Sequence, residues 1–159
     1  MTSIRASEIS WSYPSAPALD LNGPTVPFRP FREDWIDRPA VELFRSAAEE
    51  FGDHVACEDL TGQLTYAQVW AASRRLAHMI DAAVPAGQPV GVLLPNEAAY
   101  PVAVLACLAA NRPCVMIDRH HPEDRVAGIV RDAGLGAIVL RQSDGVAAAS
   151  LPVGVRTIV

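Results

Sequence analysis

Apolar positions along residues 39–140 follow two spacings that alternate with each other. A spacing of three and four residues is typical of an amphipathic helix, and short continuous apolar runs are typical of buried strands. The predicted helices cover residues 39–51, 66–84, a segment that ends near 111, and 122–133; the predicted strands cover residues 54–58, 64–65, 90–94, 113–117, 136–140 and 153–159. This alternation predicts an α/β fold: an open, mostly parallel, doubly wound sheet with helices on both faces.

Individual residues mark the ends of these helices. Pro39 suits the first position of the first helix. Thr65 is the predicted N-cap of the second helix, with Gln68 as its capping-box partner. Pro101 has to lie near the first turn of the third helix, because proline lacks a backbone donor. Gly134 is the predicted C-cap of the fourth helix.

The same spacing predicts which side chains face the core. In the second helix the inward stripe consists of Val69, Ala72, Leu76, Met79 and Ile80, with Arg74 and Arg75 outside. In the fourth helix it consists of Val126, Ile129 and Val130. Residues 90–94 and 113–117 are apolar throughout, which predicts strands that are covered on both faces.

The first 38 residues differ in composition from the rest of the chain. Their dense prolines prevent a long helix or a central strand. These are Pro14, Pro17, Pro24, Pro27 and Pro30, and the aromatic residues among them are Trp11, Tyr13, Phe28, Phe31 and Trp35. We therefore expect residues 1–38 to form an extended arm over the surface of a domain made by residues 39–159.

The overall composition is that of a globular protein. Half of the residues are hydrophobic and 19% are charged, which argues against wholesale disorder. The net charge is −5 and no arginine cluster stands out, which argues against nucleic-acid and membrane partners. No signal-peptide pattern is present, and the most apolar stretch, residues 98–110, is shorter than the roughly 20 residues that span a bilayer. We expect a cytoplasmic protein.

All 13 basic residues are arginines, so the chain contains no lysine. This excludes a phosphate-loop lysine, a Schiff base and a lysine that contacts a reacting carboxylate. A guanidinium does not replace a compact ammonium freely. Cys57, Cys107 and Cys114 form no Cys-x-x-Cys pair, so we expect small buried hydrophobic residues rather than a zinc site or disulfides.

The densest polar cluster comprises Asp118, His120, His121, Glu123 and Asp124. Metal binding or acid/base chemistry is one interpretation. The favoured interpretation is a loop after a strand, followed by a helix whose N-terminus attracts the two acids that begin it.

Two further patterns look catalytic but lack the required context. Gly134-Leu135-Gly136 begins like a dinucleotide fingerprint, yet Val139 occupies the third glycine position and the segment runs from helix to strand, the reverse of the required direction. Ser143-Asp144-Gly145 is a turn signal with no histidine near it in sequence. We therefore predict no catalytic, cofactor-binding or metal-binding residue in this chain.

Three segments share their order and spacing with a known group of enzymes. Gly62–Val69 is similar to Leu-Thr-Tyr-x-Glu-Leu, and Val90–Asn96 is similar to Val-Gly-Ile-x-Leu. Leu105–Ala133 is similar to Leu-x-Ala-Gly-x-x-Tyr-Val-Pro-Leu-Asp followed by Pro-x-x-Arg-x-x-x-Ile-x-x-x-Ala. Together they resemble the N-terminal part of AMP-forming ligases, such as nonribosomal peptide synthetase adenylation domains and acyl-CoA ligases. The resemblance covers about residues 38–159.

The sequence departs from this family pattern at a few positions. Asn111 stands where the family usually has glycine, and Met116 stands where it usually has proline. Asparagine tolerates left-handed backbone better than most residues, so the turn at Asn111 is expected to survive. The segment from Arg119 to His121 is also atypical, which indicates a divergent branch.

The resemblance implies a parent enzyme that uses ATP and Mg²⁺ to activate an amino or acyl carboxylic acid as an acyl-adenylate, for transfer to coenzyme A or a carrier protein. In the family the phosphate loop, the adenine-binding residues and the reacting lysine come later in the chain. We therefore expect an N-terminal fragment that supplies scaffold and cleft wall, is inactive alone, and works with the remainder of the ligase. We also expect self-association through exposed apolar surface at an open sheet edge. The alternative is a naturally short, non-catalytic protein-interaction module.

Overall fold

The computed structural model describes residues 31–141 and 154–158. The chain divides into two units, Met1–Glu33 and Asp34–Val159. Most of the predicted N-terminal arm, residues 1–30, lies outside the described residues. Among the described residues, the 3-10 turn η2 (Glu33–Trp35) precedes the regular elements. These are α1 (Ala40–Glu50), β1 (Val55–Asp59), β2 (Gly62–Thr65), α2 (Tyr66–Ala83), β3 (Val90–Leu93), α3 (Ala99–Ala109), β4 (Cys114–Met116), α4 (Glu123–Ala133), β5 (Ala137–Leu140) and β6 (Arg156–Ile158), in the predicted order.

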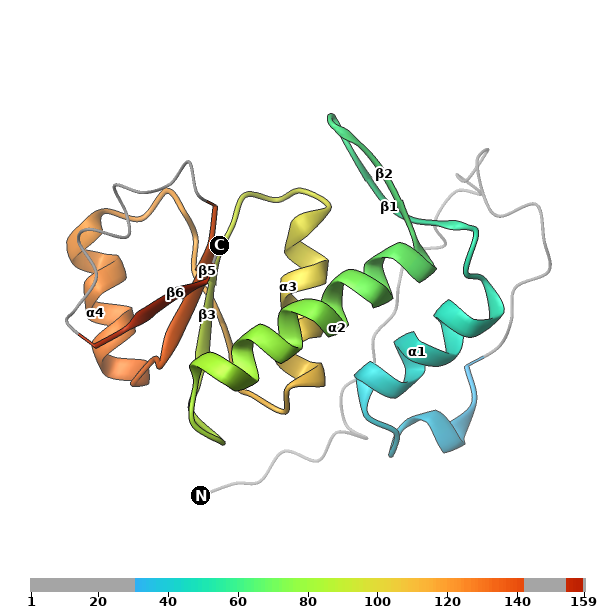
Figure 1. The fold of residues 1–159 in the computed structure, drawn as a ribbon, viewed down its shortest axis with the longest axis horizontal. Coiled ribbons are helices and arrows are strands. Elements are labelled where there is room, and N and C mark those ends of the chain that lie inside the picture. Colours follow the sequence, from blue (N-terminus) through green and yellow to red (C-terminus); the bar gives the residue numbers. More distant parts are fainter. Residues whose placement is uncertain (1–30, 142–153, 159) are drawn as a thin grey trace, which may run out of the picture. The chain divides into compact units, whose positions relative to one another are not determined.

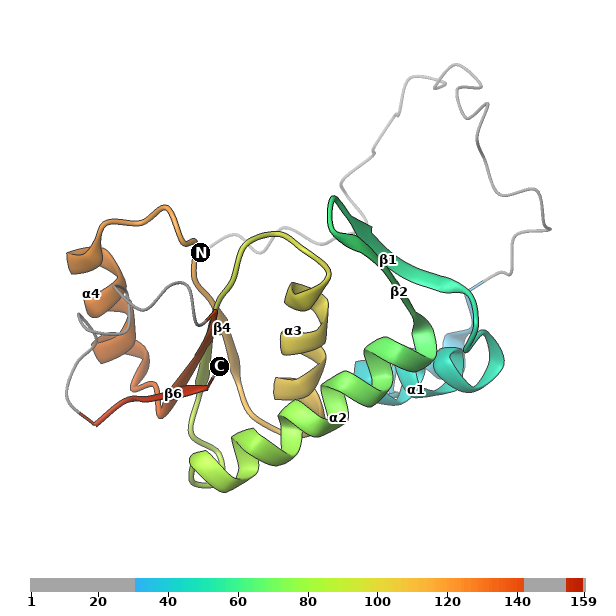
Figure 2. The same ribbon diagram turned by 45° about the horizontal axis from the view of Figure 1, so that its top comes forward.

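The larger sheet has the order β4-β3-β5-β6, and every described pair in it is parallel. Strand β3 lies between β4 and β5, with Val90 opposite Cys114 on one side and Ala137 on the other. Strands β1 and β2 form a separate antiparallel hairpin, which leads directly into α2 (Figures 1 and 2). The predicted parallel α/β sheet is therefore confirmed.

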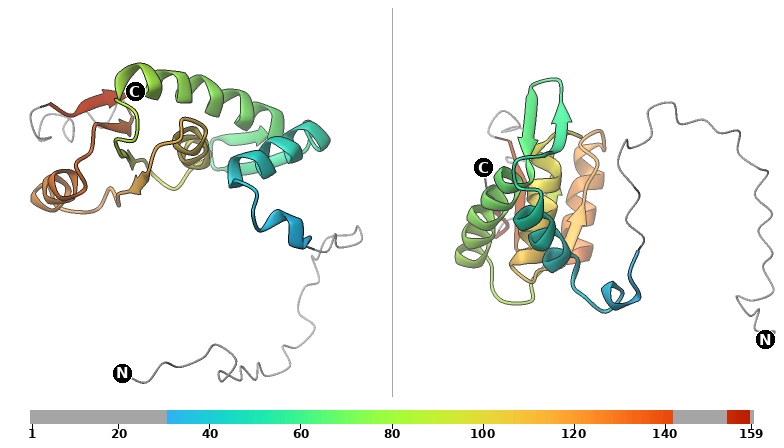
Figure 3. Two further views of the ribbon diagram at one scale, coloured as in Figure 1. Left: turned by 90° about the horizontal axis from the view of Figure 1, so that it is seen from below. Right: turned by 90° about the vertical axis from the view of Figure 1, so that its right-hand side faces the viewer.

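Helices cover both faces of this sheet (Figure 1; Figure 3, left). Successive side chains of a strand point to opposite faces, so β3 sends Val92 to one side and Leu93 to the other. Val92 belongs to a buried cluster with residues of α2 and α3, such as Ile80 and Ala106. Leu93 belongs to a second cluster with residues of α4, such as Val130. The core thus consists of two apolar layers separated by the sheet.

The helix ends follow the predicted local signals. The Thr65 hydroxyl accepts the Gln68 N–H at 3.3 Å, and the Gln68 side-chain oxygen accepts the Thr65 N–H at 2.9 Å, which completes the capping box. Gly134 closes α4 in the left-handed conformation, with φ of 62°. Asn111, after α3, has φ of 52°, which confirms the expected left-handed turn. Pro101 lies in the first turn of α3.

The predicted inward face of α2 was partly wrong. The fully buried residues are Val69, Ser73, Ala77 and Ile80, whereas Met79 is 48% exposed. The apolar spacing left out Ser73, whose hydroxyl lies 2.8 Å from the Val69 carbonyl oxygen and 3.1 Å from that of Val102 in α3. A serine with such partners is compatible with a buried helix contact.

The prediction that β4 is covered on both faces holds only in part: Cys114 packs against one apolar layer and Val115 against the other, whereas Met116 is exposed. Strand β4 is at the edge of the described sheet, and its last residue, Met116, is 65% exposed. Its apolar sequence could not reveal its position in the strand order. Across residues 31–141 and 154–158, no helix has both the length and the apolar character needed to cross a membrane.

Candidate functional site

The polypeptide leaves two neighbouring parallel strands toward opposite faces of the sheet. From β3 it enters α3, which packs on the same face as α2, and from β4 it enters α4 on the other face. The two connections therefore diverge outside the carboxyl ends of β3 and β4. In open α/β sheets, ligands bind in the crevice at such a topological switch point.

A crevice of about 590 Å³ lies at this point. We call it the switch-point crevice; it is lined by Leu94, Pro95, Asn96, Tyr100, Met116, Ile117, Asp118, Arg119 and His120. Its floor is apolar, because Leu94 and Ile117 are buried. Polar side chains from both connections form its exposed rim. An apolar floor with a few polar groups is the usual composition of a small-molecule site.

Asp118 and His120 form a hydrogen-bonded pair on this rim. Oδ1 of Asp118 accepts the backbone N–H of His120 at 2.9 Å and lies 2.9 Å from Nδ1 of its ring. The backbone bond, followed by the side-chain bond, lowers the pKa of Asp118, so the carboxylate is charged at neutral pH. The pair therefore presents an oriented imidazole beside a permanent negative charge.

The rest of the His-rich cluster forms a loop followed by the start of a helix, as the favoured interpretation predicts. The His121 N–H donates to the Asp118 carbonyl at 3.1 Å, which closes a turn. Glu123 and Asp124 then occupy the first turn of α4, where a negative charge is favourable. Within the residues that the structure describes, no three His, Cys, Asp or Glu side chains are grouped so that they could hold a metal ion.

Tyr100 contributes a phenol to the crevice. Burial, followed by the nearby Cys114, raises the pKa of Tyr100, so its hydroxyl remains protonated at neutral pH. A protonated phenol is both a donor and an acceptor of hydrogen bonds.

The starts of α3 and α4, beside the switch-point crevice, carry carboxylates that disfavour a phosphate at these two positions. Helix N-termini are the usual phosphate sites of α/β folds. Here the Asp59 carboxylate accepts the Ala98 N–H, at the start of α3, at 2.8 Å. Glu123 and Asp124 occupy the start of α4. The connection after β3, residues 94–97, contains no glycine that would let backbone approach a phosphate. Carboxylates at both positions repel a polyphosphate.

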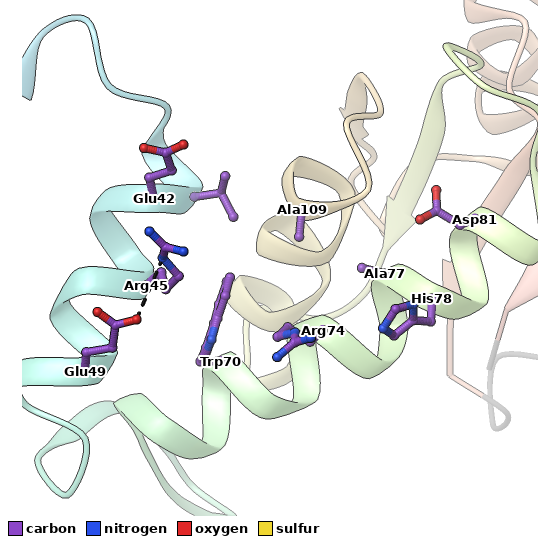
Figure 4. Close-up of a pocket in the computed structure, with 10 residues that line it drawn as sticks. Glu42, Arg45, Glu49, Trp70, Arg74, Ala77, His78, Asp81 and Ala109 are labelled. Atoms are coloured by element: carbon purple, nitrogen blue, oxygen red, sulfur yellow. Dashed lines mark ion pairs between the residues drawn. The ribbon is translucent and has the colours of Figure 1, made fainter.

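A second hollow, of about 570 Å³, lies along α1, α2 and α3 (Figure 4). Trp70 projects from α2 into it, with Arg74 and His78 farther along the same helix. Arg45 and Glu49 of α1 form an ion pair at 3.8 Å across one helical turn. The complete lining is Val41, Glu42, Arg45, Glu49, Trp70, Arg74, Ala77, His78, Asp81 and Ala109. Acidic and basic groups are mixed, so this hollow favours neither an anion nor a cation.

The other described residues that the sequence singled out are a helix cap, a close-packed glycine and free thiols. Gly134 ends α4 in the left-handed conformation, and a Cβ on Gly136 would approach Val84 Cγ1 to 2.6 Å. Cys107 is buried, Cys57 and Cys114 are half-buried, and all are free thiols. Residues 143–145 lie outside the described residues. That the chain holds no catalytic, cofactor-binding or metal-binding residue stays a prediction.

The family model described as AMP-binding enzyme matches residues 44–158. The chain belongs to the AMP-binding enzyme family. Syringomycin synthase SyrB1 of Pseudomonas syringae pv. syringae is 35% identical to it over 99 residues, which are 62% of this chain and 16% of that protein. Phosphinothricin tripeptide synthetase PhsC of Streptomyces viridochromogenes is 33% identical over 102 residues, 64% of this chain and 9% of that protein. The chain thus spans a small part of the length of these two relatives.

Solved structures of AMP-binding enzymes share the fold. The nonribosomal peptide synthetase FmoA3, bound to alpha-methyl-L-serine-AMP, superposes with a TM-score of 0.69 and 26% identity over 74% of this chain and 13% of that chain. O-succinylbenzoate coenzyme A synthetase of Bacillus subtilis, in complex with AMP, superposes with a TM-score of 0.65 and 24% identity over 76% of this chain and 31% of that chain. The resemblance to the N-terminal part of an AMP-forming ligase is confirmed.

The sequence alone did not single out the crevice residues that follow β3. Leu94 and Tyr100 look like ordinary core residues in an apolar stretch. The available signal was their position directly after a predicted strand. Using it required knowing that β3 and β4 are neighbours and that their helices lie on opposite faces, which is long-range information.

Proposed function

We propose that this chain is the supporting N-terminal part of an adenylation domain in a larger ligase. The parent reaction joins a carboxylic acid to ATP, giving an acyl-adenylate and pyrophosphate, and then transfers the acyl group to the thiol of coenzyme A or of a carrier protein. The match of residues 44–158 to the AMP-binding model is the observation that carries this proposal.

Within that domain the chain provides rigid scaffold and one wall of the substrate cleft. Two apolar layers on either side of the parallel sheet support this role, because they fix the carboxyl ends of β3 and β4 in space. A site on sheet strands is held more precisely than one on loops alone.

The chain alone should not activate a substrate. It has no lysine, and carboxylates occupy the helix N-termini beside its switch-point crevice. ATP and Mg²⁺ would therefore be held by other parts of the parent enzyme, where the metal would neutralise phosphate charge. Since the reaction consumes ATP, we place the parent enzyme in the cytoplasm. Its likeness to large synthetases does not favour the alternative of a short interaction module.

Carboxylate-dependent ATP–pyrophosphate exchange, measured on the polypeptide that the complete gene encodes, tests this proposal. A panel of amino acids and acyl acids should include at least one that stimulates exchange well above the acid-free control. A matched deletion of residues 44–158 should abolish the exchange. A complete polypeptide that folds but exchanges with no acid would contradict the proposal.

A further inference from the structure

We propose that the switch-point crevice binds a small primary amine that carries an aromatic or aliphatic body. This binding does not require ATP and does not rest on the proposed adenylation function. The inference rests on the position of the crevice in the fold, its apolar floor and the hydrogen-bond acceptors on its rim.

The floor of the crevice suits an apolar body. Leu94 and Ile117 are 7% and 2% exposed and lie beside the half-buried ring of Tyr100. Met116 reaches the same crevice and is 65% exposed, which is high for a large hydrophobic side chain. A thioether packs well against aromatic rings. A ligand ring or alkyl chain in the crevice would cover this apolar surface.

The rim offers hydrogen-bond acceptors at one side of that floor. Both bonds that Asp118 makes with His120 use Oδ1, so Oδ2 is available to another donor in the described structure. In the neutral tautomer whose Nδ1–H donates to Asp118, Nε2 of His120 is an acceptor. A primary ammonium has three donors and can satisfy both groups.

The charges around the crevice favour a cation over an anion. Asp118 lines it, and the Asp59 carboxylate lies at the start of α3, where it accepts the Ala98 N–H. Glu97 is paired with Arg141 and contributes little net charge. Arg119 is the one permanently cationic side chain among the crevice residues that the structure describes. A carboxylate ligand would therefore meet more repulsion than attraction.

Titration of the 159-residue chain with two matched probes tests the proposal. Phenethylamine carries an ammonium and 3-phenylpropionate a carboxylate on nearly the same body, and neither requires ATP. At about pH 7 the amine is protonated. We expect saturable amine binding with a dissociation constant on the order of 1 mM and at least tenfold weaker binding of the carboxylate. In amide NMR spectra, shifts should be confined to residues 94–100 and 116–120.

Two variants distinguish amine binding in the crevice from a general effect of the protein's negative charge. Asp118→Asn should weaken amine binding about tenfold, whereas Asp124→Asn, which removes a charge from α4 outside the crevice lining, should leave it nearly unchanged. The amide spectra show whether each variant is folded. As a second probe, Met116→Lys places a competing ammonium at the crevice and should also weaken binding.

Absence of saturable amine binding would overturn the proposal. So would equal or tighter binding of 3-phenylpropionate, unchanged affinity in a folded Asp118→Asn variant, or shifts confined to the hollow along α1 and α2. Failure of ATP–pyrophosphate exchange in the complete enzyme would leave amine binding unaffected, so the two proposals fail separately.

Discussion

The carboxylate of Asp59 accepts a hydrogen bond of 2.8 Å from the backbone N–H of Ala98. Asp59 ends strand β1 of the hairpin, and Ala98 immediately precedes α3, where it provides no side-chain cap. The other carboxylate oxygen accepts the N–H and hydroxyl of Thr61, each at 2.6 Å. One side chain therefore stabilises the hairpin turn and caps a distant helix, where a negative charge is favourable.

Replacing Asp59 with asparagine should change the acid sensitivity of the fold. Hydrogen bonds from the Thr61 hydroxyl, and then from the Ala98 N–H, lower the pKa of Asp59 from 3.8 to about 2. A lowered pKa in the folded state means that the stabilisation is complete above the unfolded value of 3.8 and is lost as pH falls toward 2. In urea unfolding, the midpoint of the natural chain should exceed that of Asp59→Asn above about pH 4 and approach it below about pH 3. A difference that is constant with pH would count against this role.

Gly136→Ala should destabilise the fold by about 1–3 kcal/mol, as overpacking does. The new Cβ would lie 2.6 Å from Val84 Cγ1 and 2.7 Å from the Gln88 side chain. Val84 is 3% exposed and has little room to move. Gly128→Ala is the matched control, because a Cβ there meets nothing within 4 Å. It should stabilise α4 by about 0.5–1 kcal/mol. Equal effects at both positions in urea unfolding would disprove the packing argument.

Asn111 should tolerate glycine but not valine. Its φ of 52° lies in the left-handed region, and the turn is held by the Arg112 N–H, which donates to the Cys107 carbonyl at 2.9 Å. Asn111→Gly should leave the free energy of unfolding nearly unchanged. Asn111→Val should lower it by about 1–2 kcal/mol, because a β-branched side chain is strained there. Thermal unfolding of the two variants gives the comparison, and a stable valine variant would contradict it.

Neighbouring residues of α2 should respond very differently to truncation. Ile80 is fully buried and Met79 is 48% exposed. Ile80→Ala should cost about 2–5 kcal/mol of unfolding free energy, whereas Met79→Ala should cost less than about 1 kcal/mol. Urea unfolding of both variants checks which face of the helix is buried. A loss for Met79→Ala as large as that for Ile80→Ala would support the face that the sequence predicted, which contained both residues.

Local signals allowed much of this fold to be predicted. Thr65 with Gln68, Gly134 and Asn111 each set a helix end through contacts within a few residues, and each lies where the sequence placed it. The alternating helical and strand spacings of apolar residues predicted the α/β class, because these spacings are also local. These features depend on neighbours along the chain and need no knowledge of the strand order.

The remaining features depend on contacts between distant segments. Ser73 is buried because the Val102 carbonyl of another helix lies 3.1 Å from its hydroxyl. Met116 is exposed in β4, the strand that ends the described strand order. The switch-point crevice exists because the loops after β3 and β4 turn to opposite faces of the sheet. The sequence around a polar residue or an apolar run does not reveal such long-range contacts.

Exchange of labelled pyrophosphate into ATP by the pure 159-residue chain, with Mg²⁺ and a panel of carboxylic acids, tests the central claim most directly. The claim is that these residues form the scaffold of an AMP-binding enzyme without its reactive groups. We predict a rate indistinguishable from that of buffer for every acid. Robust acid-dependent exchange by this chain alone would contradict the account.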